Sequence, residues 1–309
     1  MRRVLIVCNH FAVCGGRYMY DAFRRLGADV RAVGPDFGSE IWGMTLAASR
    51  AWKSCGTLET AWKNWTPDLV YYSSLPPYAF NPVYRGVPHV VHAVDNHVRC
   101  FRQEGIDHYF MAHRYSTVMS IDGPRDTWLP CAYDPEAFTP SPIPFCQREF
   151  DVALVGVMYP HRQGLIDAMR EAGFKVAART GAVYDEYRDI YHNSRISLCL
   201  SYAGDVAMRI FETAAMKCVV LSDSCEDFAP LQADGIVIYQ SVSHAVRVVK
   251  QLLANPEMAE GLIERSSAWA KPHTWDARAR VILDWLAANP RRPDNAATVI
   301  RNEAHTTGL

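Results

Sequence analysis

Two charged side chains stand one turn apart in an otherwise apolar stretch, RIFETAAMKCVVLSD, at residues 209–223. The stretch is typical of a short helix that runs into a buried strand, and Arg209 and Glu212 share one face of that helix. An arginine beside the free N–H groups of a helix N-terminus suits a diphosphate. A carboxylate one turn on can accept from both hydroxyls of a ribose. Spacing alone, however, favours a surface ion pair.

Two more residues bear on the same question. Asp205 follows Gly204 just before the helix, and its type and position predict the helix N-cap. In GVMYPHRQG, Arg162 comes soon after a predicted strand, where it could contact a phosphate. Spacing alone favours an ordinary solvated arginine at this position too.

The N-terminal half offers residues for the other substrate. VDNH ends a predicted strand, so Asp95 and His97 could contact an acceptor or act as a base. The plain alternative for Asp95 is a turn-forming aspartate. The loop CNHFAVCGG, with His10, Gly15 and Gly16, follows the first strand and could approach the transferred sugar or a phosphate. Packing within the loop accounts for His10 equally well.

Other nucleotide and metal motifs are missing from the sequence. Neither G-x-G-x-x-G at a first turn nor G-x-x-x-x-G-K-[ST] occurs, and no Cys/His spacing indicates zinc. HVVHAVDNH is rich in histidine, but His89 and His92 would point to opposite faces of a strand. We therefore expect those two histidines to be structural.

The elements that position these residues alternate between strand and helix. RVLIVC, a helix near 17–26 and DVRAVG form a β-α-β unit, and the rhythm restarts at FDVALVGV after a stretch with six prolines, 124–149. A helix over 44–64 and a strand over 116–120 are also predicted. The pattern predicts an α/β chain of two Rossmann-like domains facing a cleft at the carboxyl ends of their strands. The predicted boundaries are an N-terminal acceptor-side domain (1–138), a linker (139–149), a C-terminal nucleotide-sugar domain (150–273), a closing helix (274–288) and a flexible tail (289–309).

Composition limits the function classes. The chain has 309 residues and a formal net charge of −1, so no overall positive field attracts nucleic acid or anionic membrane. Its nine cysteines form no C-x-x-C pair, and no apolar run is long enough for a signal peptide or a membrane span. We expect a cytoplasmic protein with reduced thiols.

Several runs, in order, resemble one family. RIFETAAMKCVVLSD is similar to the R-x-F-E-A-x-A-x-G-x-x-x-L-S-D signature of GT-B-fold glycosyltransferases. WLPCAYDPEAFTP, DVALVGVMYPHRQGLIDAM, IYHNSRISLCLS and AKPHTWDARARVILDWL resemble further runs of the spore-maturation-type family with a glycosyl-transferase group 1 C-terminal domain. The resemblance covers residues 128–286. The sequence departs from the family at Lys217-Cys218, where a small glycine is usual, and at Cys199 or Leu200, where an asparagine is usual.

The resemblance implies roles for the first residues discussed. Glu212 would bind the ribose of a nucleotide-diphosphate-sugar donor, and Arg209 and Arg162 would bind its diphosphate. In this fold the helix dipole and basic side chains stabilise the departing diphosphate. We therefore expect no metal and no cofactor beyond the nucleotide-sugar co-substrate.

The acceptor stays open between a saccharide, a small metabolite, a protein and a modified base in DNA. Arginine- and aromatic-rich runs such as VRCFRQEG and AHRYS could line a basic lip for DNA, but solvated surface arginines explain them better, and the net charge does not favour DNA. Two alternatives to a glycosyltransferase stay open: a non-catalytic nucleotide-sugar-binding protein and a nucleotide-sugar epimerase. An epimerase would require a carboxylate array and histidine at the cleft.

Overall fold

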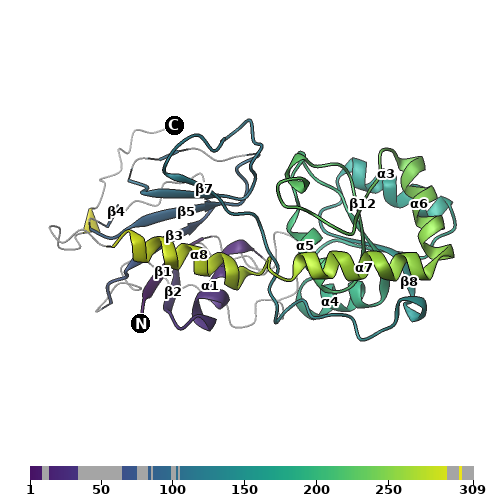
Figure 1. The fold of residues 1–309 in the computed structure, drawn as a ribbon, viewed down its shortest axis with the longest axis horizontal. Helices are drawn as coiled ribbons and strands as arrows, with labels where there is room; N and C mark the ends of the chain where they lie inside the picture. The colour runs from purple at the N-terminus through teal and green to yellow at the C-terminus, as the bar shows by residue number, and fades with distance from the viewer. Residues whose placement is uncertain are drawn as a thin grey trace, which may run out of the picture.

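The chain forms two α/β lobes side by side (Figure 1). The computed structural model describes residues 1–8, 14–33, 65–74, 83–84, 86–98, 102–103, 105–290 and 299–300. His10 and the predicted helix over 44–64 lie outside these ranges.

The N-terminal lobe is built on a six-stranded parallel sheet in the order β2-β1-β3-β5-β6-β7. The central strands β3 and β5 are buried along their whole length, and β1 is the apolar strand that the sequence predicted. The bounds are β1 Arg3–Val7, α1 Gly15–Arg25, β2 Asp29–Val33, β3 Leu69–Ser73, β4 Val83–Tyr84, β5 His89–Ala93, β6 His108–Met111 and β7 Asp126–Trp128.

The C-terminal lobe has a five-stranded parallel sheet in the order β12-β11-β10-β8-β9. Side-chain caps begin two of its helices: Ser241 and Asn255 each accept from a backbone N–H of the first turn. The bounds are η3 Phe145–Gln147, β8 Phe150–Val155, α3 Pro160–Glu171, β9 Val176–Arg179, α4 Tyr184–His192, β10 Ser194–Cys199, α5 Met208–Ala215, β11 Val219–Ser222, η4 Glu226–Phe228, β12 Ile236–Ile238, α6 Val242–Ala254 and α7 Pro256–Ala270.

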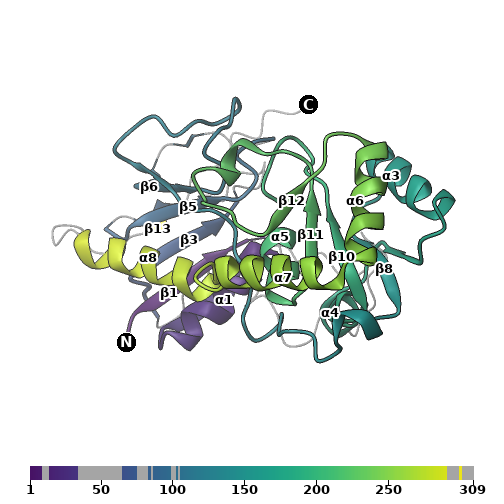
Figure 2. The same cartoon turned by 45° about the vertical axis from the view of Figure 1, so that its right-hand side comes forward.

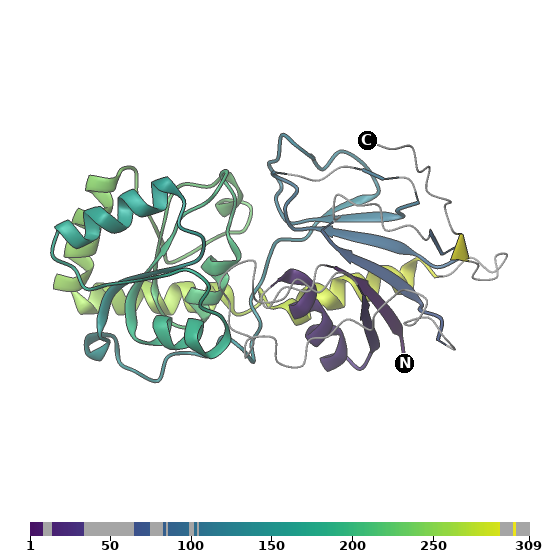
Figure 3. The ribbon, with the colours of Figure 1, turned by 180° about the vertical axis from the view of Figure 1, so that it is seen from behind.

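The last helix, α8 (Trp275–Ala288), returns to the N-terminal lobe and packs on α1. Helices α7 and α8 run end to end along one side of both lobes (Figures 1 and 2). The chain therefore passes between the lobes twice, once through the crossing segment, residues 129–144, and once between α7 and α8. Figure 3 shows the same two lobes from behind.

Buried and partly buried polar contacts join the two passes. Arg278 of α8 donates to the carbonyl oxygens of Pro130 (2.7 Å) and Cys131 (3.2 Å). Arg25 of α1 pairs with Asp134 of the crossing segment at 2.8 Å and with Asp276 of α8 at 2.5 Å. Two of the runs that resemble the glycosyltransferase family, WLPCAYDPEAFTP and AKPHTWDARARVILDWL, therefore form the joint between the lobes.

Each sheet has a topological switch point, a place between two neighbouring strands whose following connections run to opposite sides of the sheet. In the N-terminal lobe this point lies between β1 and β3, and in the C-terminal lobe between β8 and β10. Loops that follow the carboxyl ends of strands at such points are where open α/β sheets bind ligands. Arg114 N–H donates to Asp227 Oδ2 at 3.2 Å, so loops beyond β6 and β11 meet between the lobes.

One local prediction is wrong. No strand forms over residues 116–120, because the Ser116 hydroxyl donates to Asn96 O and accepts from the N–H groups of Val118 and Met119. This local turn replaces strand pairing. Within the predicted flexible tail, β13 (Val299–Ile300) pairs antiparallel with β4. In the part of the chain that the structure describes, no helix combines the length and the apolar character needed to cross a bilayer.

Candidate functional site

Two guanidinium groups converge on Gly156, the residue that follows β8. A Cβ atom at Gly156 would lie 2.5 Å from Arg209 Nη2 and 3.7 Å from Arg162 Nη1. The residue also has a φ of +143°, which side-chain-bearing residues rarely adopt. Glycine is therefore required here, because any side chain would displace Arg209.

The two arginines lack a counter-ion. Arg162 donates to Val157 O (3.0 Å) and Leu200 O (2.8 Å), while its Nε and the Nε and Nη1 atoms of Arg209 are buried without an acceptor. Burial, followed by the nearby charge of Arg209, lowers the pKa of Arg162. Within the described ranges, no carboxylate comes within ion-pair distance of either guanidinium. Buried cations with unused donors form a site for an anion.

The helix that carries Arg209 leaves its first N–H groups open. The expected N-cap is wrong: α5 starts after Ala207, which has no capping side chain. Asp205 instead accepts from the N–H groups of Tyr202 (2.7 Å) and Ala203 (3.1 Å) in its own loop. An aspartate readily forms this local turn, and here the turn competes with helix capping.

Glu212 is buried and does not form an ion pair with Arg209, so the surface-pair interpretation is wrong. Its Oε2 accepts from Tyr187 Oη at 2.5 Å. Burial raises the pKa of Glu212 to about 7, although the hydrogen bond from Tyr187 and the charge of Arg209 oppose this shift. Glu212 also raises the pKa of Tyr18 of α1, where burial is the larger cause, so it lies near the other lobe. Arg162, Arg209 and Glu212 thus gather at the inner edge of the C-terminal lobe.

The candidates on the N-terminal lobe follow β5. The Asp95 carbonyl accepts from Val98 N–H, but no described group hydrogen-bonds its carboxylate, so the side chain does not make the turn. His97 points into the interface instead: its Nε2 is 3.8 Å from Asp205 Oδ1, and its ring centre is 4.2 Å from that of His113. Burial, together with His113, lowers the pKa of His97 despite the nearby carboxylates.

Gly15 and Gly16 lie in the first turn of α1. A Cβ atom at Gly16 would be 2.8 Å from Cys8 Sγ, and one at Gly15 would be 3.4 Å from Val94. These glycines therefore allow the helix to pack tightly against the ends of β1 and β5. Packing alone explains Gly16, and its role toward a ligand stays a prediction.

Sequence reasoning missed Gly156, Tyr187 and His113. The spacing of Gly156 and Arg162 within one predicted β-to-α turn was a usable signal for the glycine. His113 had none, because its partners are distant in sequence: His97, His113 and Asp205 offer ligand atoms within 4.8 Å of one another. The expected structural roles of His89 and His92 agree with their burial and their bonds to Tyr72 and Tyr71.

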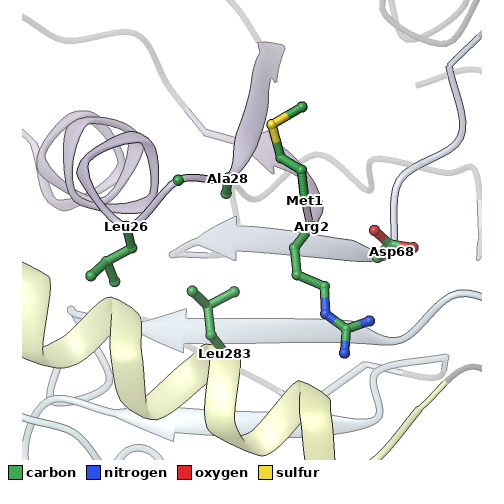
Figure 4. A pocket seen from close by; sticks show the side chains of 7 residues that line it. Met1, Arg2, Leu26, Ala28, Asp68 and Leu283 are labelled. Atoms are coloured by element: carbon green, nitrogen blue, oxygen red, sulfur yellow. The ribbon is translucent and has the colours of Figure 1, made fainter.

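A separate hollow of about 450 Å³ lies at the opposite edge of the N-terminal sheet (Figure 4). Its lining comes from the amino ends of strands and from α8. Arg2 and Asp68 are its charged residues, and Leu26, Ala28 and Leu283 give it an apolar side. It contains none of the site residues above.

Known proteins resemble this chain in part of its sequence and in its fold. Residues 144–284 match a family described as glycosyl transferase-like. Sucrose-phosphate synthase from Thermosynechococcus elongatus has a similar structure, with a TM-score of 0.60 at 11% identity over 94% of this chain and 99% of that chain. An alpha-glucosyltransferase in complex with UDP-glucose and DNA containing an abasic site has a TM-score of 0.66 at 10% identity over 92% and 99%. No curated protein matches the sequence.

The fold is therefore the two-domain GT-B arrangement of glycosyltransferases, as predicted. The C-terminal lobe carries the family match, and the match and the fold together support a glycosyltransferase. A UDP-GlcNAc 2-epimerase from Neisseria meningitidis, bound to UDP-GlcNAc, is also similar, with a TM-score of 0.52 at 13% identity over 93% and 100%. That likeness lies in the fold.

The buried Glu212 predicts a pH-dependent stability. Its folded pKa of about 7 exceeds the usual 4.5, so ionisation should lower the free energy of unfolding as pH rises from about 4.5 to 7. Glu212→Gln removes this penalty. At pH 8 we expect the free energy of unfolding of the variant to exceed that of wild type by on the order of 2–3 kcal/mol, so the variant should unfold at a higher temperature. The difference should shrink toward pH 5.

Thermal unfolding across this pH range measures the effect. Glu171→Gln, on the exposed end of α3, is the control and should follow wild type. A Glu212→Gln protein that is less stable than wild type at pH 8 would contradict the assignment.

Proposed function

We propose that this protein transfers a sugar from a nucleotide-diphosphate-sugar donor to an acceptor held by the N-terminal lobe. The observation that carries the proposal is the unpaired Arg162–Arg209 cluster over Gly156, in the lobe that matches the glycosyl transferase-like family. Membership of the narrower spore-maturation-type family belongs to the proposal and rests on the order of the matching runs. A cytoplasmic location remains part of the proposal as well.

The donor is proposed to lie with its diphosphate against the two arginines and the open end of α5. When the sugar leaves, negative charge grows on the diphosphate, and donors already fixed in a dry site stabilise that charge most. Arg209, with two buried donor atoms unused, is best suited to this task. No metal is needed at the diphosphate in this arrangement, and no cofactor besides the nucleotide sugar.

The ribose is proposed to bind Glu212. Tyr187 holds this carboxylate in place from α4, and Glu212 accepts best when ionised. Because its pKa is about 7, donor affinity should rise between pH 6 and 8. The base and the sugar stay open; UDP is the first probe, because a structure of similar fold holds UDP-glucose.

The acceptor is proposed to approach Asp95. Its carboxylate follows β5 at the inner edge of the N-terminal lobe, and no described group occupies it, as a general base requires. His97 is less well suited, because its ring is buried beside His113 and Asp205. His10, Gly15 and Gly16 remain proposed contacts of the transferred sugar or phosphate.

The acceptor class stays open between a saccharide, a metabolite, a protein and a base in DNA. The similar alpha-glucosyltransferase was solved with DNA, but the net charge of this chain is −1. The epimerase alternative is kept because of the fold likeness to the UDP-GlcNAc 2-epimerase. Formation of a free epimer of the donor sugar, with no transfer, would select it.

Removing one guanidinium tests the diphosphate site. Arg209→Ala should weaken binding of the preferred nucleoside diphosphate by about 10- to 100-fold, because a charged hydrogen bond contributes about 1.5–3 kcal/mol. Titration calorimetry with the diphosphate measures this change. Arg170→Ala, on the exposed face of α3, should bind as wild type. Unchanged affinity in Arg209→Ala would refute the diphosphate assignment.

Asp95→Asn tests the base. This change keeps the shape of the side chain but removes the proton acceptor, so kcat for transfer should fall by about 100-fold or more, while donor affinity stays unchanged. Initial rates with the identified acceptor and calorimetry with the donor separate these effects. Full transfer activity in Asp95→Asn would exclude the role.

A further inference from the structure

Four titratable side chains meet where the two lobes touch, apart from the arginine cluster. His97 and His113 come from the N-terminal lobe, and Asp205 and Asp227 from the C-terminal lobe. His97 Nε2 lies 3.8 Å from Asp205 Oδ1, and His113 Nδ1 lies 3.7 Å from Asp227 Oδ2. Ligand atoms of His97, His113 and Asp205 all lie within 4.8 Å of one another. We call these four residues the interlobe cluster.

The charges of the interlobe cluster do not balance. The side chains of Asp205 and Asp227 are 11% and 4% exposed, so both carboxylates are largely removed from water. Over the described residues, neither has a lysine or arginine within ion-pair distance, and histidines are their only basic neighbours. Two buried carboxylates without a cation are strongly unfavourable. Backbone N–H groups of Tyr202, Ala203 and Arg114 are hydrogen-bonded to the two carboxylates, but these groups supply no full positive charge.

The hydrogen bonds of His113 independently indicate that a cation is absent from the cluster. Its Nε2 lies 3.1 Å from the carbonyl oxygen of Val94, which can only accept, so Nε2 must carry the proton. In the neutral ring, Nδ1 then turns a lone pair toward the Asp227 carboxylate. Nδ1 is buried without a hydrogen-bond partner, as are Asp227 Oδ1 and His97 Nδ1. Electron pairs face one another here unless a cation lies between them.

The surroundings of His113 match those of a metal-binding histidine. Such histidines usually donate their second ring N–H to a carbonyl or carboxylate, which fixes the ring for the metal. In His113 the carbonyl oxygen of Val94 is this acceptor. The side chain of Asn96 also accepts from the backbone N–H of His113 at 2.9 Å. Asp205 is likewise fixed by two backbone N–H groups. The donor atoms therefore sit on restrained side chains.

We propose that the interlobe cluster binds one divalent transition-metal ion, with His97, His113 and Asp205 as ligands and Asp227 as the second carboxylate. Two imidazoles and two carboxylates suit Zn²⁺ best, in tetrahedral coordination. Ligand atoms around such an ion are about 3.3–3.6 Å apart, given bonds of about 2.0–2.2 Å. The 3.7 and 3.8 Å separations are slightly wider, and separations within the triad reach up to 4.8 Å, so the side chains must move closer together when an ion binds.

The ion would join the lobes. Two ligands come from loops beyond β5 and β6, and the carboxylates come from loops beyond β10 and β11. The ion would neutralise both carboxylates and hold the inner edges of the two sheets together. It uses none of the arginines of the diphosphate site, although the charge of Asp205 also acts on the pKa of Arg162.

Metal content and thermal unfolding of the tag-free full chain, without nucleotide, test the site. After EDTA dialysis and addition of ZnCl₂, wild type should retain about one Zn²⁺ per chain by mass spectrometry and unfold several degrees higher than the metal-free protein. His97→Gln in one lobe and Asp205→Asn in the other should each lose both effects. Co²⁺ loading should give tetrahedral visible bands without a sulfur-to-cobalt band, which excludes the cysteines as ligands.

His108→Gln is the matched control. His108 is equally buried and bonds Thr127 Oγ1, but it lies outside the interlobe cluster, so its variant should bind Zn²⁺ as wild type. Variants that fold, judged by circular dichroism, yet keep one Zn²⁺ would overturn the proposal. So would a wild type that neither retains Zn²⁺ nor unfolds at a higher temperature when Zn²⁺ is added.

Discussion

Two positive charges without a partner determine how the rest of this molecule can work. The guanidinium groups of Arg162 and Arg209 are brought together over Gly156 at the switch point of the C-terminal sheet, and buried N–H groups of both remain unused. Such an arrangement is unfavourable until an anion arrives, because burial removes the water that would otherwise solvate the charges. The open N-terminus of α5 and the carboxylate of Glu212 fit the same ligand, a diphosphate attached to a ribose.

The two lobes are suited to binding one substrate each, because two passes of the chain hold them facing one another. Arg25 and Arg278 tie the crossing segment to α8, so the loops at the carboxyl ends of both sheets stay opposite one another. The proposed base Asp95 follows β5 of one lobe, and the arginine pair lies on α3 and α5 of the other. Two of the four runs that resemble glycosyltransferases outside the donor helix form these joints, so a structural role accounts for them.

Much of this arrangement could be read from the sequence. Apolar strand runs and their alternation with helices predicted both sheets. The motif around Arg209 and Glu212 singled out an arginine with buried guanidinium nitrogens and a buried carboxylate, and their role toward a sugar donor stays a proposal. What failed depended on contacts between distant residues or on local competition. Burial of Glu212 and its bond to Tyr187 are invisible to helix spacing, and Asp205 was misread as a cap because its side chain bonds its own loop. His113 meets Asp227 only through the packing of the lobes.

The most direct test of the central claim is a thermal-unfolding series with nucleosides, their monophosphates, their diphosphates and the corresponding diphosphate sugars. Each series consists of the compounds that share one nucleobase. If the arginine pair binds a diphosphate, the nucleoside and the monophosphate of the preferred base should raise the unfolding temperature little. In that series, the diphosphate and its sugar should raise the unfolding temperature by several degrees at concentrations well above Kd. Equal stabilisation by nucleoside and diphosphate, or none by any member of any series, would contradict the account.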